Sequence, residues 1–258
     1  FRRVLFRSPK TNTMDRSSAP TIINPFDAHA VEEAVKIKKK FGGKVSIMSM
    51  GPPQAQEVIK KCIEMGADEG YLLSDRAFAG SDTLSTSYIL AMGIKKIIEI
   101  EPIDLVFCGK QAIDGDTAQV GPGIACRLGM PQLTYVEAIE SFDLKKNIVI
   151  LHRKIDNGYE VVQAKLPCLI TVEKDINELS FSPLTNMIKA ARYNPTTWGI
   201  NDFNADLSQL GLKGSPTSVR RIFPPKQRAG GELLKGSEDE VVKTLVDKLK
   251  GGILECQI

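Results

Sequence analysis

The sequence predicts an α/β fold: a mostly parallel, open sheet with helices on both faces, followed by a β-hairpin and an extended C-terminal arm. Two observations support this. In the first half of the 258-residue chain, short apolar segments alternate with amphipathic segments of helical period, the pattern of βαβ units. The composition agrees, because 42% apolar residues suffice for one large domain, or for a domain with an extended tail.

The elements of the first half follow from apolar periodicity and from residues that begin or end helices. Asp27 is expected to cap a helix over residues 28–41, which Gly42 and Gly43 end. Asp82 is expected to cap a later helix over residues 83–100. The other expected elements are strands over residues 44–50, 70–73 and 105–108, and helices over residues 53–65 and 118–128.

After Pro131 the pattern changes to strands. We expect them over residues 133–139, 147–155, 159–165 and 168–172. Asp156, Asn157 and Gly158 tolerate positive φ, so the middle two strands should form a hairpin. Residues 181–231 show little periodicity, which predicts a loop region or an arm that packs on something else, and a C-terminal helix should begin near Ser237.

The composition argues against several classes of protein. A net charge of +3, from 34 basic and 31 acidic side chains, predicts no nucleic-acid partner. The five cysteines lack Cys-x-x-Cys spacing, which predicts a reducing, cytoplasmic compartment and no metal. His29 and His152 are too few for a zinc site or a catalytic triad, so each is expected to be a surface or capping residue. We predict no catalytic residue.

No segment approaches the ~20 apolar residues that a membrane-spanning helix needs, so no membrane span is expected. Residues 1–8 are basic and apolar, but they lack the length of a signal peptide's apolar core and a small-residue cleavage site. Because the chain has no initiator Met, whether residues 1–8 are native is left open.

The segment from residue 104 to residue 122 carries the strongest functional signal. Leu105 to Cys108 form an apolar run typical of a buried parallel strand, and Gly109 stops it. In open α/β sheets ligands collect beyond the carboxyl ends of strands, where the next helix offers unpaired N–H groups and the positive end of its dipole. Three glycines would let the backbone approach a phosphate closely: Gly115, Gly121 and Gly123.

Polar residues of this loop suit the same ligand. Thr117 and Gln119 can hydrogen-bond to a phosphate or a ribose. Asp114 and Asp116 would repel a phosphate, so we assign them to backbone N–H groups as caps, or to a ribose hydroxyl. Neither a P-loop lysine motif nor a Gly-x-Gly-x-x-Gly motif is present, and two interpretations stand: a nucleotide site, or an ordinary capped strand-to-helix turn.

From about residue 10 to the C-terminus the chain resembles the beta subunit of an electron-transferring flavoprotein. The motifs that carry the resemblance are Asn24-Pro25-Phe26-Asp27, Met50-Gly51-Pro52-Pro53-Gln54, Met65-Gly66-Ala67-Asp68 and the loop from Gly109 to Pro122. The resemblance implies a Rossmann-like fold that binds an adenine nucleotide, AMP in some members and a second FAD in others. The residues it assigns to the nucleotide are Asn24, Pro25, Phe26, Asp27, Met50, Asp114, Gly115, Asp116, Thr117, Ala118, Gln119, Val120, Gly121, Pro122, Gly123, Ile124 and Ala125.

Residues 74–83 and 116–122 resemble the electron-bifurcating branch of the family, which favours FAD over AMP. In that branch NADH gives a hydride to the beta-subunit FAD. One electron then goes to a low-potential acceptor such as ferredoxin or flavodoxin, and the other goes to the FAD bound mainly by the alpha subunit. Arg76 is our candidate for a cation near the flavin or the phosphates; the alternative is a surface arginine before a capped helix.

Residues 183–190 resemble the family's recognition loop, in which a leucine anchors a partner acyl-CoA dehydrogenase. Leu184 is therefore a predicted docking anchor, with plain packing as the alternative. Residues 215–226 resemble the arm that wraps the alpha subunit. We accordingly expect a nucleotide-binding domain over residues 1–180, and a recognition loop, an arm and a helix packed on the alpha subunit over residues 181–258.

One departure from the family is large. Its members open with a short strand and a Lys-Gln-Val-Pro-Asp loop that touches the nucleotide, whereas residues 1–8 stand in that place here. Either the first strand is missing or replaced, which we favour, or nucleotide binding is weakened.

The leading hypothesis is an electron-carrier subunit of a prokaryotic heterodimer. An enzyme that adenylates or splits ATP is a second hypothesis, but no Ser-Gly-Gly-x-Asp-Ser type of loop is present for it. A third is a non-redox module that binds AMP and carries no colour.

Overall fold

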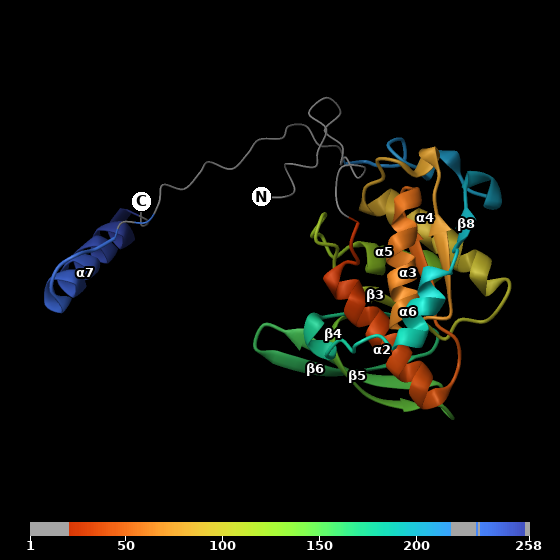
Figure 1. Cartoon of the computed structure of the whole chain (residues 1–258), viewed down its shortest axis with the longest axis horizontal. Helices are drawn as coiled ribbons and strands as arrows, with labels where there is room; N and C mark the ends of the chain where they lie inside the picture. Colours follow the sequence, from red (N-terminus) through yellow and green to blue (C-terminus); the bar gives the residue numbers. More distant parts are fainter. Residues whose placement is uncertain (1–20, 218–230, 232, 256–258) are drawn as a thin grey trace. The chain divides into compact units, whose positions relative to one another are not determined.

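A computed structural model describes residues 21–217, 231 and 233–255 of the chain. The described residues fall into two units: residues 21–217 belong to the first, and the described residues from 231 onward belong to the second (Figure 1). The second unit contains helix α7 (Glu238–Glu255), and the strands lie in the first. Within the described ranges, no helix is both long and apolar enough to cross a membrane.

The first unit contains a sheet of three parallel strands in the order β1-β2-β8. These strands are β1 (Ser46–Met50), β2 (Glu69–Leu73) and β8 (Thr196–Trp198). Two helices pack on β2. Ile59 of α3 (Gln56–Met65) shares a core cluster with Leu72 of β2, and Ile89 of α4 (Thr83–Ile98) shares another with Leu73. Successive strand residues point to opposite faces, so the two helices cover opposite faces.

The second sheet has five strands in the order β3-β7-β4-β5-β6. They are β3 (Leu105–Gly109), β7 (Cys168–Val172), β4 (Gln132–Asp143), β5 (Ile148–Ile155) and β6 (Gly158–Lys165). β3, β7 and β4 are parallel, whereas β4, β5 and β6 are antiparallel. The pairing of Ile155 with Gly158 leaves Asp156 and Asn157 as a two-residue hairpin turn.

Helices also cover both faces of β7, which is buried along its whole length. Ile170 packs with Ala30 of α2 (Pro25–Phe41), whereas Leu169 packs with Ile124 of α5 (Val120–Leu128). The remaining short elements are η1 (Pro53–Ala55), η2 (Arg76–Phe78), η3 (Lys174–Ile176), α6 (Leu184–Ala191), η4 (Ile200–Asp202) and η5 (Leu207–Gln209).

The predicted fold class is confirmed, with open sheets, parallel strands, helices on both faces and the hairpin, although the described strands form two sheets rather than one. The cap at Asp82 is also confirmed, because its carboxylate accepts hydrogen bonds from the N–H groups of Leu84 and Ser85. The cap at Asp27 is wrong. Helix α2 begins earlier, at Pro25 after Asn24, since the fixed φ of proline suits the first helical turn.

The segment after residue 181 is more regular than its composition suggests. It contains α6 and β8, and Trp198 and Leu210 are buried in one core cluster with Leu73. Three-residue β8 is too short to show a period in sequence, and its pairing with β2 defines it. The expected arm around Pro224 and residues 1–8 lie outside the described residues.

Candidate functional site

The loop between β3 and α5 lies at the carboxyl end of a parallel strand, as the sequence predicted. Gly109 ends β3 and Val120 begins α5. Between them Gly115, Asp116 and Thr117 are exposed. A Cβ atom built on Gly115 would meet nothing within 4 Å, so this part of the loop borders open space.

Asn24 and Asp27, at the start of α2, hold the first half of this loop. The Gly109 N–H donates to Asp27 Oδ1 at 2.6 Å. Asn24 Nδ2 donates to Asp27 Oδ2 at 2.8 Å and to the Gln111 carbonyl at 2.9 Å, and Asn24 Oδ1 accepts from the Ile113 N–H at 3.2 Å. Two side chains that are distant in sequence therefore fix the path of the loop.

Asp27 is half-buried, and its carboxyl group has a perturbed pKa. Burial raises the pKa above its ordinary value of 3.8, and hydrogen bonds from the Gly109 N–H and Asn24 oppose that rise without cancelling it. The neighbouring Phe26 packs closely on the strand end, because a Cβ atom at Gly109 would lie 2.6 Å from Phe26 Cβ. Pro25 supplies the first residue of α2.

The second half of the loop is conformationally strained. Asp116 and Ala118 adopt φ values of 60° and 55°, in the left-handed region that favours glycine. Strained residues of this kind persist only where the surrounding structure over-determines them, and they are concentrated at ligand-binding sites.

Helix α5 begins without a cap from its own N-terminal residue. Gln119 makes no side-chain capping bond, and its Oε1 accepts instead from Thr83 Oγ1 at 3.0 Å, which links the starts of α5 and α4. The N-terminal turn of α5, from Val120 to Pro122, consequently presents its positive dipole end without a neutralising side chain from Gln119.

Two glycines of this helix face the protein rather than open space. A Cβ atom at Gly121 would lie 2.5 Å from Thr171 Cγ2, and one at Gly123 would lie 2.8 Å from Ser87 Cβ. They let α5 pack against β7 and α4. Ile124 and Ala125, further along α5, are buried in the core.

The remaining predicted residues lie on other elements. Met50 is the last residue of β1 and is half-buried beside the cluster of Leu73. Arg76 is exposed in η2, which follows β2. Leu184 is the first residue of α6 and is 70% exposed. His29 Nδ1 lies 2.9 Å from Asn177 Oδ1.

Sequence reasoning missed a group of residues beside the loop. Lys110 Nζ lies 2.7 Å from Glu173 Oε1 and 4.9 Å from the centroid of the Tyr135 ring. Lys110 directly follows the end of β3, and Glu173 directly follows the end of β7. Because the ends of parallel strands meet at one edge of a sheet, this shared position could have predicted from the sequence that the two side chains lie close together. Thr83 was likewise not assigned to the loop.

The loop between β3 and α5, together with the start of α5, fits an adenine nucleotide. The open space at Gly115 admits a bulky group, and the uncapped start of α5 offers N–H donors and positive potential to a phosphate. For a metal the donor chemistry is poor: in the part of the chain that the structure describes, no group of three His, Cys, Asp or Glu side chains is placed to hold an ion.

The sequence matches the electron transfer flavoprotein domain over residues 11–198, which is more than half of the chain. The chain belongs to the electron transfer flavoprotein family. Within it, the chain is 48% identical to protein FixA of Azotobacter vinelandii over 240 residues, covering 93% of this chain and 85% of that protein.

Two further relatives are similarly close. The caffeyl-CoA reductase-Etf complex subunit CarD of Acetobacterium woodii is 48% identical over 94% of this chain and 91% of its own length. The electron transfer flavoprotein subunit beta of Megasphaera elsdenii is 46% identical over 93% of this chain and 89% of its own length. The predicted resemblance is thereby confirmed: this is an electron transfer flavoprotein of the beta-subunit and FixA type, an electron-transfer protein whose family implies an alpha-subunit partner.

Proposed function

We propose that this electron transfer flavoprotein chain is the beta subunit of a heterodimer that carries out flavin-based electron bifurcation. NADH is the donor, and a low-potential carrier such as ferredoxin or flavodoxin is one acceptor. An acyl-CoA dehydrogenase-type flavoenzyme is the other partner. The subunit is an electron carrier that oxidises NADH only within the heterodimer, in the cytoplasm of a prokaryote.

One observation carries the proposal. At the carboxyl end of β3, a strained loop that is held by hydrogen bonds with Asn24 and Asp27 leads into a helix without a side-chain cap. Its open side at Gly115 suits a dinucleotide, and the start of α5 suits the phosphates. When bound, FAD supplies hydride and one-electron chemistry, and the protein supplies binding, orientation and electrostatics. The 48% identity to a subunit of a caffeyl-CoA reductase-Etf complex supports the bifurcating form.

The residues of the site divide into two roles. Thr117, Ala118, Gln119 and the first turn of α5 contact the nucleotide, whereas Asn24 and Asp27 orient the loop from behind. Their side chains are already bound to Gly109, Gln111 and Ile113, which supports positioning rather than direct contact. Arg76 and Met50 contribute from the carboxyl ends of β2 and β1.

Counting the nucleotides of the co-purified heterodimer tests the proposal. We expect two FAD per heterodimer and bleaching by NADH. One FAD with one AMP would instead mark a non-bifurcating electron transfer flavoprotein. AMP with no flavin colour would mark a non-redox nucleotide-binding module.

A substitution at Gly115 tests the loop. Because a Cβ atom there meets nothing within 4 Å, Gly115→Val should change the free energy of unfolding by less than about 0.5 kcal/mol. The branched side chain would enter the proposed dinucleotide space, so the beta-subunit nucleotide should be lost while the heterodimer persists. Gly231→Val, also at an open glycine, is the control and should keep full nucleotide occupancy. Full occupancy in both variants would contradict the loop assignment.

A further inference from the structure

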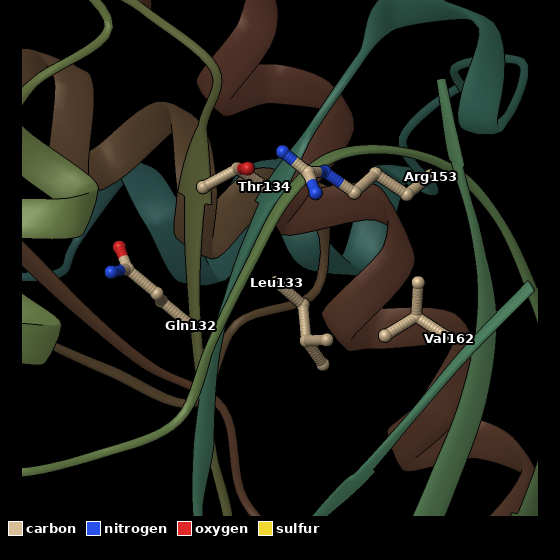
Figure 2. Close-up of a pocket in the computed structure, with 5 residues that line it drawn as sticks. All are labelled: Gln132, Leu133, Thr134, Arg153 and Val162. Carbon is tan, nitrogen blue, oxygen red and sulfur yellow. The ribbon is translucent and has the colours of Figure 1, made fainter. Parts of the chain in front are cut away.

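A separate cavity of about 300 Å³ lies where the first residues of β4 meet β5 and β6 of the second sheet. Its lining residues come from β4, β5 and β6: Gln132, Leu133, Thr134, Arg153 and Val162. Figure 2 shows the guanidinium of Arg153 reaching across the cavity toward Thr134, with Leu133 and Val162 forming an apolar side. None of these residues belongs to the proposed nucleotide loop.

Arg153 is only partly paired. Its Nη1 lies 3.5 Å from Glu160 Oε2, at the limit of a hydrogen bond, and its side chain is 41% exposed. Its Nε, by contrast, is buried and has no hydrogen-bond partner among the described residues, the one such side-chain atom there. A buried donor on a charged group is costly to leave unpaired, so the site favours an acceptor at this position.

The wall opposite Arg153 is built by an irregular strand. The register of β4 against β7 shifts between Leu133 and Val136, and Tyr135 within this bulge has a φ of 58°. The Tyr135 N–H leaves the β-ladder pattern and donates to Thr171 Oγ1 at 3.2 Å. The pairing of β4 with β5 reaches no further than Val136 with Arg153. Bulges and strained residues are concentrated beside binding sites, where they redirect side chains.

We propose that this cavity binds a carboxylate carried on a short apolar chain. The Nε–H and one Nη–H of an arginine form a side-on fork that matches the two oxygens of a carboxylate. Gln132 and Thr134 offer further polar groups, and Leu133 and Val162 pack on the methylene groups. Glu160, close to Nη1, disfavours a doubly charged phosphate more than a singly charged carboxylate.

Such a carboxylate has two sources: a free short-chain acid, or an acidic side chain of the alpha subunit that the family implies. The co-purified heterodimer distinguishes them. Its melting temperature is measured in sodium butyrate against sodium chloride at equal ionic strength, and the dissociation constant of the two subunits is measured by sedimentation. Flavin content is recorded separately, so that failure of the nucleotide proposal is not confused with failure of this one.

Three variants make the test specific. Arg153→Lys keeps the charge but removes the fork, and Val162→Phe fills the cavity while leaving Arg153 in place. Lys154→Gln is the matched control, because it removes a positive charge from the next residue, which pairs with Asp175 at 3.0 Å and does not line the cavity. Circular dichroism checks that each variant is folded.

A free acid predicts that butyrate raises the melting temperature of the wild type and Lys154→Gln but not of the other two variants. An alpha-subunit side chain predicts no butyrate effect. It also predicts that the dissociation constant of the two subunits rises about tenfold in Arg153→Lys and Val162→Phe but is unchanged in Lys154→Gln. The proposal is overturned if neither pattern is seen, or if a crystal structure of the heterodimer with butyrate places a group other than a carboxylate on Arg153 Nε.

Discussion

At the scale of single residues, the donor and acceptor roles of the Asn24 and Asp27 side chains are fixed by their hydrogen bonds. Asn24 uses its carbonyl oxygen on the Ile113 N–H and its amide nitrogen on the Gln111 carbonyl, so it cannot rotate without losing both bonds. The same nitrogen donates to Asp27 Oδ2. Asp27 must therefore be an acceptor on both oxygens, which a carboxylate satisfies and an amide does not.

Asp27→Asn should consequently destabilise the protein. Its carbonyl oxygen can still accept from the Gly109 N–H, but its amide nitrogen would face the amide nitrogen of Asn24. We expect the free energy of unfolding to fall by about 1–3 kcal/mol, the range for an unsatisfied buried polar group. Urea unfolding measures this, and an unchanged midpoint would contradict the geometry.

The same variant gives a pH dependence. Because burial raises the folded-state pKa of Asp27 above 3.8, the folded protein binds more protons than the unfolded chain in the interval between the two pKa values. The contribution of Asp27 to the free energy of unfolding therefore decreases as pH rises from 3.8 through the raised pKa. The difference in unfolding free energy between the wild type and Asp27→Asn should shrink over that interval and then stay constant.

Ala118 provides a prediction about strain. Its φ of 55° disfavours any residue with a Cβ atom, so Ala118→Gly should raise the free energy of unfolding by about 0.5–1 kcal/mol. Ala112→Gly, an exposed residue of the same loop without a positive φ, should instead lower it slightly. Equal effects of the two substitutions in thermal unfolding would argue against strain at residue 118.

At the scale of elements, α5 depends on two glycines for its distance from its neighbours. The sequence assigned Gly121 and Gly123 to the approach of a phosphate. In the structure their missing Cβ atoms face Thr171 of β7 and Ser87 of α4. Close packing of α5 on β7 accounts for Gly121, and close packing of α5 on α4 accounts for Gly123. The phosphate contact remains a proposal for the start of the helix.

Gly121→Ala should accordingly reduce stability rather than nucleotide binding alone. The new Cβ atom would lie 2.5 Å from Thr171 Cγ2, well inside van der Waals contact. Overpacking of this kind costs about 1–3 kcal/mol. The double variant Gly121→Ala, Thr171→Ser removes the clashing methyl group and should recover most of the loss in chemical denaturation.

At the scale of the whole molecule, α6 presents an apolar surface to solvent. Leu184 is 70% exposed, Met187 47% and Ile188 46%, and Phe181 just before the helix is fully exposed. Exposed apolar groups that lie together mark interaction sites. This surface supports the docking role that the resemblance gave to Leu184.

Leu184→Ala should leave the fold and flavin content unchanged, because the side chain is mostly exposed and its truncation costs less than about 0.5 kcal/mol. Electron transfer to the acyl-CoA dehydrogenase-type partner should slow by about tenfold, as for a docking anchor. Leu144→Ala, at a residue 62% exposed beyond the end of β4, is the control. Equal rates in stopped-flow measurements would assign Leu184 to packing.

The sequence alone determined the class of fold, the hairpin, the cap at Asp82 and the place, after β3, of the loop that we propose binds the nucleotide. Each of these depends on local information: apolar periodicity, turn residues and the residues that end a strand. The motifs also indicated the family, because they recur in fixed order and spacing.

Only the tertiary structure decided which side chains contact one another across distant parts of the chain. Asp27 reaches Gly109 across 82 residues, Gly121 faces Thr171, and Arg153 meets β4 at a bulge. None of these contacts leaves a period or a spacing in the sequence, because each joins elements that packing brings together from distant parts of the chain. Local patterns therefore indicated the candidate site, and long-range packing set the direction of each side chain within it.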